Sequence, residues 1–564
     1  MSSTKPYSLK IGEIVIQSLT IILLVFFLID TKIYFYLSLQ FFFAFSYIAL
    51  ILTGIVISWH WLTSSEIKIT LSLLLMGVWG IFVLLHTHLV KPAEEYKVFY
   101  LMSGILYFFG FTFLFRKQKI KFEQLYRLFA WFAVVQAVVC LLQGIGLFSS
   151  GDLNYAMKGT FNNPNTTAMY LALAFPFFLS NVISKNKIKL HGIATIALFA
   201  AIVLLKCRTA YVGLVVVSIV FFLKNESIKS RWSRVGRIAK LCILITTLAL
   251  LTGLFSFLYF QKKASADGRI FVWKVSLEML KDNPLTGVGY GFFERDYNLS
   301  QAHYIQTQST TTSEKEHARY VYMPYNDFLE HALEGGAMGF LLYALLMAWI
   351  VLLAVRSKRL DMAAIVLAYS VMMLINFAQQ AIPVWVLFLT ATAALTTHEK
   401  PLFVFSNKHL INWNCALALL IVFVFGMKLH IRKHAQEQLQ VAIGECKLGN
   451  FHNAMHILDR NVDDAGTSEA YFRHYGSILI AGRKTKEACR ILERATCYSS
   501  TPSLQLDLAF TYLKLGERDK AMERLVLVQN MVPTNKRAKE LMRRIKALPI
   551  TAPSTSSQVK HISL

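Results

Sequence analysis

The chain has 564 residues, of which 55% are hydrophobic and only 16% are charged. Because the apolar residues form many runs of about 18 or more, this composition excludes a soluble globular class and predicts a polytopic membrane protein. Much of the formal net charge of +25 lies in short loops that follow every second apolar run, and therefore on one side of the predicted membrane. That pattern indicates membrane orientation and argues against nucleic acid as a partner.

Apolar segments within residues 1–429 predict an all-α bundle of about 12–13 membrane spans. The first run lacks a small-residue cleavage site and is followed at once by another span, so we expect it to remain as an anchor. The predicted spans are residues 10–29, 33–58, 67–90, 96–115, 122–148, 166–184, 188–206, 209–223, 239–260, 327–355, 361–380, 383–397 and 410–428.

Lysine and arginine are concentrated in the loops that follow even-numbered spans. By the positive-inside rule these loops face the cytoplasm. The intervening loops are poor in both residue types, so Arg208 and the long segment 261–326 are expected on the outer side. The basic loops are residues 116–121, 185–187, 224–240 and 356–359.

Two arginines on that outer side are candidate anion ligands. Arg208 opens an apolar span, where a charge is costly and needs an anionic partner. In the long outer segment, Asp267 is expected to cap a helix that Pro284 ends, which places Arg269 in the first turn. Free amides at a helix start and a guanidinium both attract phosphate oxygens, but pairing of Arg269 with Asp267 or a lipid headgroup is the alternative.

The same predicted helix carries an apolar stripe that suits a helix lying at the membrane surface. The stripe consists of Ile270, Trp273, Leu277 and Leu280. No strand precedes the glycine-rich segment 287–291, so we interpret this segment as a turn rather than a dinucleotide-binding loop.

Residues 158–166 predict a turn followed by an asparagine cap on the sixth span. The asparagines at this membrane surface are also placed to bind sugar hydroxyls. They are Asn162, Asn163 and Asn165. The seven cysteines show neither CxxC nor His/Cys ligand spacing, so we predict no metal site and no disulfide framework.

From residue 430 the apolar runs give way to amphipathic helical segments with an internal repeat. Gly449, Gly482 and Gly516 are spaced by 33 and 34 residues. The alanines that follow them, Ala454, Ala488 and Ala521, are spaced by 34 and 33. This spacing resembles tetratricopeptide repeats, in which glycine permits a tight turn and alanine allows close helix packing.

We therefore predict an α-solenoid over residues 430–548, followed by a disordered Ser/Thr/Pro-rich tail over 549–564. Its function is either to dock an acceptor or partner protein or to act as a stabilising or dimerising cap. The number of predicted spans places this C-terminal part on the same side of the membrane as Arg208. The basic stretch 428–433 argues for the opposite side.

Four motifs lie in a characteristic order among the spans. They are Gly159–Asn165 before a span, Arg208–Ala210 opening another, Gly268–Gly289 with Trp273, and Tyr325–Gly339 after the long segment. Together they resemble the bacterial O-antigen ligase and polymerase superfamily, which includes the protein O-oligosaccharyltransferases. The resemblance covers roughly residues 120–400, and the order of the motifs carries it more than any single one.

The resemblance implies a GT-C-like transferase that is inverting, uses no metal or other cofactor, and takes its glycan from undecaprenyl pyrophosphate. Transfer is then expected on the periplasmic side of the bacterial inner membrane. Arg208 and Arg269 become a clamp for the leaving diphosphate, where negative charge grows in the transition state. Many family members have His-Asn where this chain has Tyr325-Asn326. A tyrosine with an ordinary pKa of about 10 is a poor base, so His317 is our candidate base.

These arguments define the predicted site. The candidate catalytic residues are Arg208, Arg269, Tyr325, Asn326 and His317. The candidate substrate-binding residues are Asn162, Asn163, Asn165, Trp273 and Glu334.

The acceptor stays open, because ligases, polymerases and protein glycosyltransferases of this superfamily share their membrane chemistry. It is lipid A core, another lipid-linked repeat unit, or Ser or Thr of an exported protein, and the repeats favour the protein. A flippase for lipid-linked oligosaccharides is the alternative of a different class. It is disfavoured because the chain shows no matching halves with broken helices. A membrane-anchored scaffold would need neither so many spans nor the arginines.

Overall fold

The structure is a computed structural model and describes residues 38–63, 66–117, 120–152, 154–224, 226–261 and 263–547. The first predicted span, residues 10–29, and the predicted disordered tail, residues 549–564, lie outside the described residues. Each of the other predicted spans corresponds to a helix.

These helices form the membrane bundle because lipid leaves no other way to satisfy their backbone groups. By length and composition, eight helices among the described residues are apolar enough to cross a membrane, with shorter apolar helices beside them. The all-α, polytopic prediction is therefore confirmed. The bundle contains α2 (Ser38–Thr63), α3 (Leu71–Leu85) with its π-helical extension η2 (His86–Val90), α4 (Glu95–Arg116), α5 (Phe122–Gly144), α6 (Pro164–Ile183), α7 (Ile188–Leu205), α8 (Arg208–Lys224), α10 (Arg237–Gln261), α14 (Asp327–Arg356), α15 (Leu360–Met372), α16 (Ile382–Thr396) and α17 (Lys408–Lys447).

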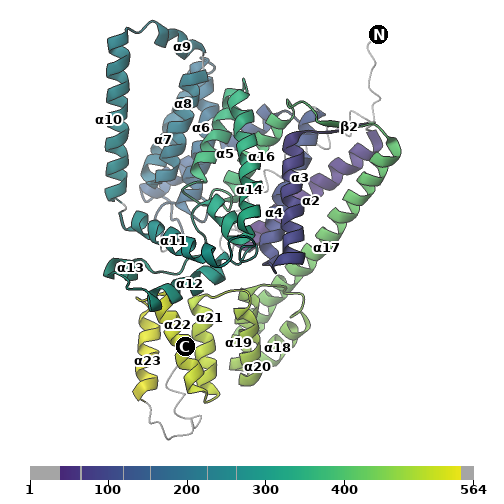
Figure 1. Cartoon of the computed structure of the whole chain (residues 1–564), viewed down its shortest axis with the longest axis vertical. Coiled ribbons are helices and arrows are strands. Elements are labelled where there is room, and N and C mark those ends of the chain that lie inside the picture. The colour runs from purple at the N-terminus through teal and green to yellow at the C-terminus, as the bar shows by residue number, and fades with distance from the viewer. Residues whose placement is uncertain are drawn as a thin grey trace.

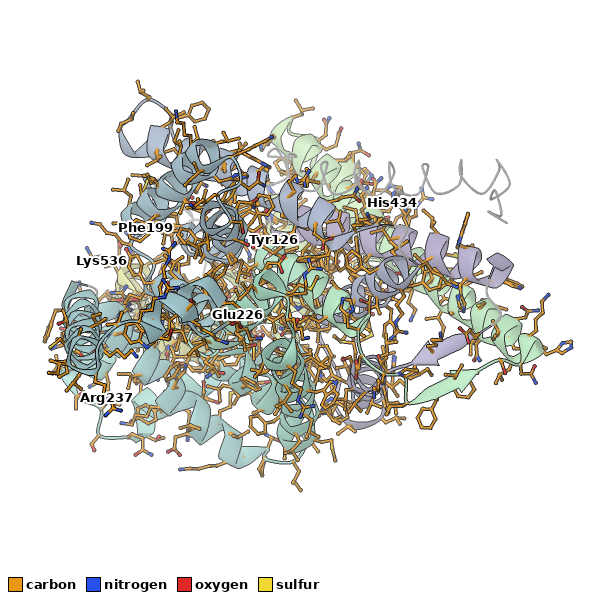
Figure 2. All side chains as sticks on the ribbon, turned by 90° about the horizontal axis from the view of Figure 1, so that it is seen from above. Tyr126, Phe199, Glu226, Arg237, His434 and Lys536 are labelled. Atoms are coloured by element: carbon orange, nitrogen blue, oxygen red, sulfur yellow. The ribbon has the colours of Figure 1, made fainter. Side chains whose placement is uncertain are left out.

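The core of the bundle lies around α16, whose residues are all buried. On α5, Tyr126 is only 1% exposed and donates its hydroxyl to the Leu173 carbonyl at 3.0 Å. Viewed from above, Tyr126 lies within the bundle, whereas Arg237 at the start of α10 lies at its edge (Figure 2). Buried polar groups in this bundle thus find partners on neighbouring helices.

The two ends of the bundle carry different elements (Figure 1). At one end lie α9 (Glu226–Ser233) and an antiparallel pair of short strands, β1 (Ile67–Ile69) and β2 (Phe403–Phe405). At the other end lie α11 (Lys263–Asp282), α12 (Phe293–Thr307), α13 (Thr312–His317) and the C-terminal helices. The long outer segment and the C-terminal helices therefore share one end, while the side of the membrane that this end faces stays a prediction.

The helix α14 is interrupted at Gly336, whose φ of 65° and ψ of −163° are not helical. The glycine-rich segment 287–291 supplies the missing hydrogen bonds: the amides of Val288 and Gly289 donate to the carbonyls of Leu333 and Glu334. A Cβ on Gly287 would lie 2.5 Å from the Glu334 carbonyl oxygen, so a larger residue would separate these backbones. The predicted turn is present, and it also stabilises a broken membrane helix.

The C-terminal helices pair where the repeat predicts. Gly449, Gly482 and Gly516 lie in the tight turns of the pairs α17/α18, α19/α20 and α21/α22, and the three repeat alanines are fully buried. The helices are α18 (Phe451–Arg460), α19 (Glu469–Ala481), α20 (Thr485–Thr496), α21 (Pro502–Lys514), α22 (Arg518–Met531) and α23 (Lys536–Ala547). Assignment to the tetratricopeptide family stays a prediction.

The C-terminal helices pack directly on the bundle and on α12. Gln301 on α12 donates to the Met531 carbonyl at 2.6 Å, and Arg432 on α17 pairs with Glu95 at 2.7 Å. These contacts hold the C-terminal helices beside the outer segment, as Figure 1 shows.

Candidate active site

Side chains from three parts of the chain lie near one another at the start of α8, on α11 and in the turn before α14. Arg208 is the first residue of α8, and Arg269 lies in the second turn of α11. The Nη1 of Arg269 donates to the Ile375 carbonyl at 2.5 Å, and its guanidinium carbon lies 4.9 Å from the centre of the Tyr325 ring. We call Arg208, Arg269 and Tyr325 the arginine site.

The two positive charges of the arginine site lie close together. Burial, and secondly the charge of Arg208, lower the pKa of Arg269. The Nη2 of Arg208 lies 3.5 Å from the Ser265 hydroxyl. Among the described residues, neither arginine forms an ion pair with a carboxylate. Two such cations favour an anion between them, and guanidinium groups bind phosphate oxygens with paired hydrogen bonds.

The predicted start of the Arg269 helix is wrong. The helix α11 begins at Lys263, so Asp267 lies inside it and Arg269 is not in its first turn. The helix begins upstream of the predicted start at Asp267, directly after α10, which ends at Gln261. The proposed clamp therefore depends on the guanidinium groups and not on free amides.

The predicted apolar stripe of α11 is not its buried face. Ile270 and Leu277 are 58% and 55% exposed, and Trp273 and Leu280 are half-buried. A neighbouring face with Val272 and Val275 is buried against the rest of the outer segment. The exposed half is what a helix at a membrane surface requires.

Tyr325 and Trp273 form one support for the arginines. Tyr325 has a left-handed backbone with φ of 56°, and burial raises the pKa of its hydroxyl, which makes it a still poorer base. The indole N–H of Trp273 donates to the Pro324 carbonyl at 2.8 Å. Trp273 was predicted to bind substrate, but its only polar hydrogen is used to hold the turn that carries Tyr325.

Two predicted site asparagines act as helix caps. The Oδ1 of Asn326 accepts from the Leu329 amide at 3.0 Å, and that of Asn163 accepts from the Asn165 amide at 2.8 Å. The cap on the sixth span is thus confirmed, and Asn162 before it is exposed. A cap fixes the start of its helix, so Asn326 contributes to the position of the Tyr325 turn.

His317 lies beside the arginine site as the last residue of α13. Its Nδ1 is 4.0 Å from the point where a Cβ on Gly268 would lie. An ion pair of 2.6 Å between Lys274 and Glu314 ties α13 to α11. The fold thus brings His317 next to Arg269.

Glu334 belongs to a second cluster, which is centred on Lys97 of α4. It is 1% exposed, and its Oε2 lies 3.9 Å from the Lys97 ammonium of α4. The same ammonium lies 2.5 Å from Glu330, which also accepts from Gln380 at 2.7 Å. Sequence reasoning missed Lys97, Glu330 and Gln380. The available signal was Lys97, an ionisable residue inside a predicted span.

A cavity of about 270 Å³ opens onto this cluster. Its polar lining consists of Glu94, Tyr96, Lys97, Tyr100, Glu294, Tyr322, Glu330, Glu334 and Gln380. Two larger cavities, of about 470 and 520 Å³, lie at the opposite end of the bundle beside Arg116. The described residues contain no group of three or more His, Cys, Asp or Glu side chains that could hold a metal ion.

His331 is a fully buried residue of α14. Its Nε2 lies 3.0 Å from the Gln379 Oε1, and its ring centre lies 4.0 Å from that of Tyr343. Its environment is therefore that of a core residue.

The fold is that of a multi-pass membrane protein. Residues 193–344 match the family model described as O-antigen ligase. The match includes Arg208, Arg269, Tyr325 and Glu334, and it confirms that this part of the chain belongs to the O-antigen ligase superfamily. The family implies a lipid-linked glycan donor and an acceptor in general terms. The chain matches none of the curated proteins.

Proposed function

We propose that this protein transfers a glycan from undecaprenyl pyrophosphate to an acceptor hydroxyl at the outer face of the bacterial inner membrane. The observation that carries the proposal is the convergence of Arg208 and Arg269 without an ion-pair partner among the described residues. A lipid diphosphate supplies the missing anion, and the exposed half of the α11 stripe is suited to the lipid surface that carries it.

The chemistry is a displacement at the anomeric carbon of the donor. The acceptor oxygen forms a bond to this carbon as the bond from the carbon to the phosphate oxygen breaks. The bonding electron pair leaves with the diphosphate, whose growing charge Arg208 and Arg269 stabilise. Attack opposite the leaving group inverts the configuration, and this step draws on side chains alone, without a metal.

The acceptor proton needs a base, and His317 is the residue we propose for it. Imidazole groups take up protons near neutral pH, whereas Tyr325 has a pKa above the usual tyrosine range. The Tyr325 ring lies against the Arg269 guanidinium, so its proposed role is to position that arginine.

Transfer can be measured with purified full-length protein and a glycan on undecaprenyl pyrophosphate. We offer lipid A core, an exported protein and the donor itself as separate acceptors. We expect one product from wild type, and its loss in both Arg208→Ala and Arg269→Ala. Arg319→Ala is the matched control, since Arg319 is an exposed arginine of the same outer segment.

The outcomes separate the candidate functions. Transfer that survives in both arginine variants would disprove the clamp. Donor binding without transfer to any acceptor, together with movement of the donor across vesicles, would favour a flippase. Extension of the donor alone would identify a polymerase of the same superfamily.

A further inference from the structure

The cavity between α4, α14 and the start of α12 is rich in carboxyl groups. We call the set Glu94, Lys97, Glu294, Glu330, Glu334 and Gln380 the carboxylate pocket. It contains four carboxyl side chains and one ammonium group, which pairs chiefly with Glu330. Glu94 and Glu294 accept hydrogen bonds from Thr467 and Ser499, whereas Glu330 and Glu334 share the single ammonium group.

One acceptor atom in the pocket lacks a hydrogen bond. The Oε2 of Glu334 is buried and has no hydrogen-bond partner among the described residues. Its nearest cation, Lys97, is 3.9 Å away and already contacts Glu330 at 2.5 Å. Because an unsatisfied buried polar group costs free energy, this oxygen indicates a ligand that donates a hydrogen bond.

The pocket neighbours the arginine site through one connecting segment, residues 373–381. The carbonyl of Ile375 in this segment accepts from Arg269, while Gln380 donates to Glu330. Tyr322 lines the pocket, three residues before Tyr325 of the arginine site. The pocket and the arginine site therefore share this connecting segment, through Ile375 at the arginines and Gln380 at the carboxyl groups.

The C-terminal helices hold two walls of the pocket. The Thr467 hydroxyl donates to Glu94 at 2.7 Å, and the Ser499 hydroxyl donates to Glu294 at 2.8 Å. The pocket therefore opens where the bundle, the outer segment and the solenoid meet. Solenoids of paired helices present surfaces that bind extended polypeptide.

From this arrangement we infer that the carboxylate pocket is the acceptor subsite and that its acceptor is a polypeptide segment with a Ser or Thr hydroxyl. Backbone amides and neutral or basic side chains supply the donors that the carboxylates require. An anionic acceptor would bring negative charge against Glu330 and Glu334, which share one ammonium group. This inference rests on the proposed transferase function and names the acceptor class for it.

The test uses purified full-length protein, the undecaprenyl-pyrophosphate glycan and a library of Ser- and Thr-containing peptides. The residues flanking the hydroxyl are lysine, alanine or glutamate in matched sets, and lipid A core is a separate arm. We expect lysine- and alanine-flanked peptides to be modified at least tenfold faster than glutamate-flanked ones. Lipid A core should give no product.

Variants of the pocket residues test whether the preference for lysine-flanked peptides depends on the carboxylate pocket. Glu334→Gln and Glu330→Gln should raise the acceptor KM and reduce the preference for lysine over glutamate. Affinity for the donor should not change in either variant, which also shows that the arginine site is still folded. Glu278→Gln on the exposed face of α11 is the matched control.

The failures of the two proposals are distinguishable. Transfer to lipid A core or to the donor itself, with no peptide modified, would overturn the acceptor inference and leave the transferase intact. Equal rates for lysine- and glutamate-flanked peptides would also overturn it. Donor binding without transfer in any arm would overturn the proposed function itself.

Discussion

The arginine site and the carboxylate pocket lie along the same segment, residues 373–381, and carry opposite charge. Arg208 and Arg269 have no carboxylate partner among the described residues, whereas Glu330 and Glu334 share one lysine. Charges buried at the end of a membrane bundle are costly unless a ligand or partner balances them. The difference fits a reaction in which a diphosphate leaves from one side and a hydroxyl arrives from the other.

The largest effect is expected at Lys97, because among the described residues it is the one cation that lines the carboxylate pocket. Lys97→Met leaves Glu330 without its partner at 2.5 Å and should destabilise the protein by about 3–5 kcal/mol. Thermal unfolding in detergent measures the loss. The double variant Lys97→Met, Glu330→Gln should recover much of it, and no recovery would contradict the pairing.

The next effect is catalytic and concerns the arginine site. Arg269→Ala should lower kcat by roughly 10²–10³-fold, since it removes a cation from the developing diphosphate charge. Arg269→Lys should restore only part of the rate, because an ammonium cannot form the paired hydrogen bonds of a guanidinium. Steady-state rates of glycan transfer test both variants. Full activity in Arg269→Ala would contradict the proposed role of the arginine site in binding the diphosphate.

A pH effect is expected at the edge of the carboxylate pocket. Burial raises the pKa of Glu294 from 4.5 to about 7, and its carboxylate faces Ser499, Ser500, Glu469 and Tyr320. Because the folded pKa is above the unfolded one, the stabilisation is complete below about pH 4.5 and is lost as pH rises through 7. Contact between α12 and the C-terminal helices should therefore loosen between pH 5 and 8, which limited proteolysis measures. Glu294→Gln should remove this pH dependence, and an unchanged profile would contradict it.

The smallest effect is expected at Trp273. Trp273→Phe keeps the aromatic ring but removes the hydrogen bond to Pro324, a net loss of about 0.5–1.5 kcal/mol. We expect kcat to fall about 2–10-fold without a change in acceptor KM, because the residue supports Tyr325 and does not contact acceptor. A selective increase in acceptor KM would instead place Trp273 in a binding surface.

Much of the membrane architecture follows from local sequence. Hydropathy located every described bundle helix, and the glycine and alanine spacing located the C-terminal helix pairs. The start of α11 was not located, because residues 261–263 have no strong stop signal and the helix extends upstream of Asp267. The break of α14 at Gly336 was also missed, since it depends on hydrogen bonds from the distant segment 287–291.

The candidate site was only half predictable. Motif order selected Arg208 and Arg269, and the structure brings them together. It also shows supporting contacts for Asn163 and Trp273, which were predicted to bind substrate, and for Asn326, which was predicted to be catalytic; those roles stay predictions. A capping asparagine and a sugar-binding asparagine have the same residue type and loop position, so sequence alone cannot separate them.

The sequence by itself determined that this chain is a helical membrane protein, because lipid forces long apolar segments into helices, and its motifs indicated the superfamily that residues 193–344 match. Only the tertiary structure decided which charges meet. Lys97 and Glu330 are 233 residues apart in the chain, yet their side chains form an ion pair. Such a pair depends on how helices pack and where they are interrupted, and a local pattern of residues predicts neither.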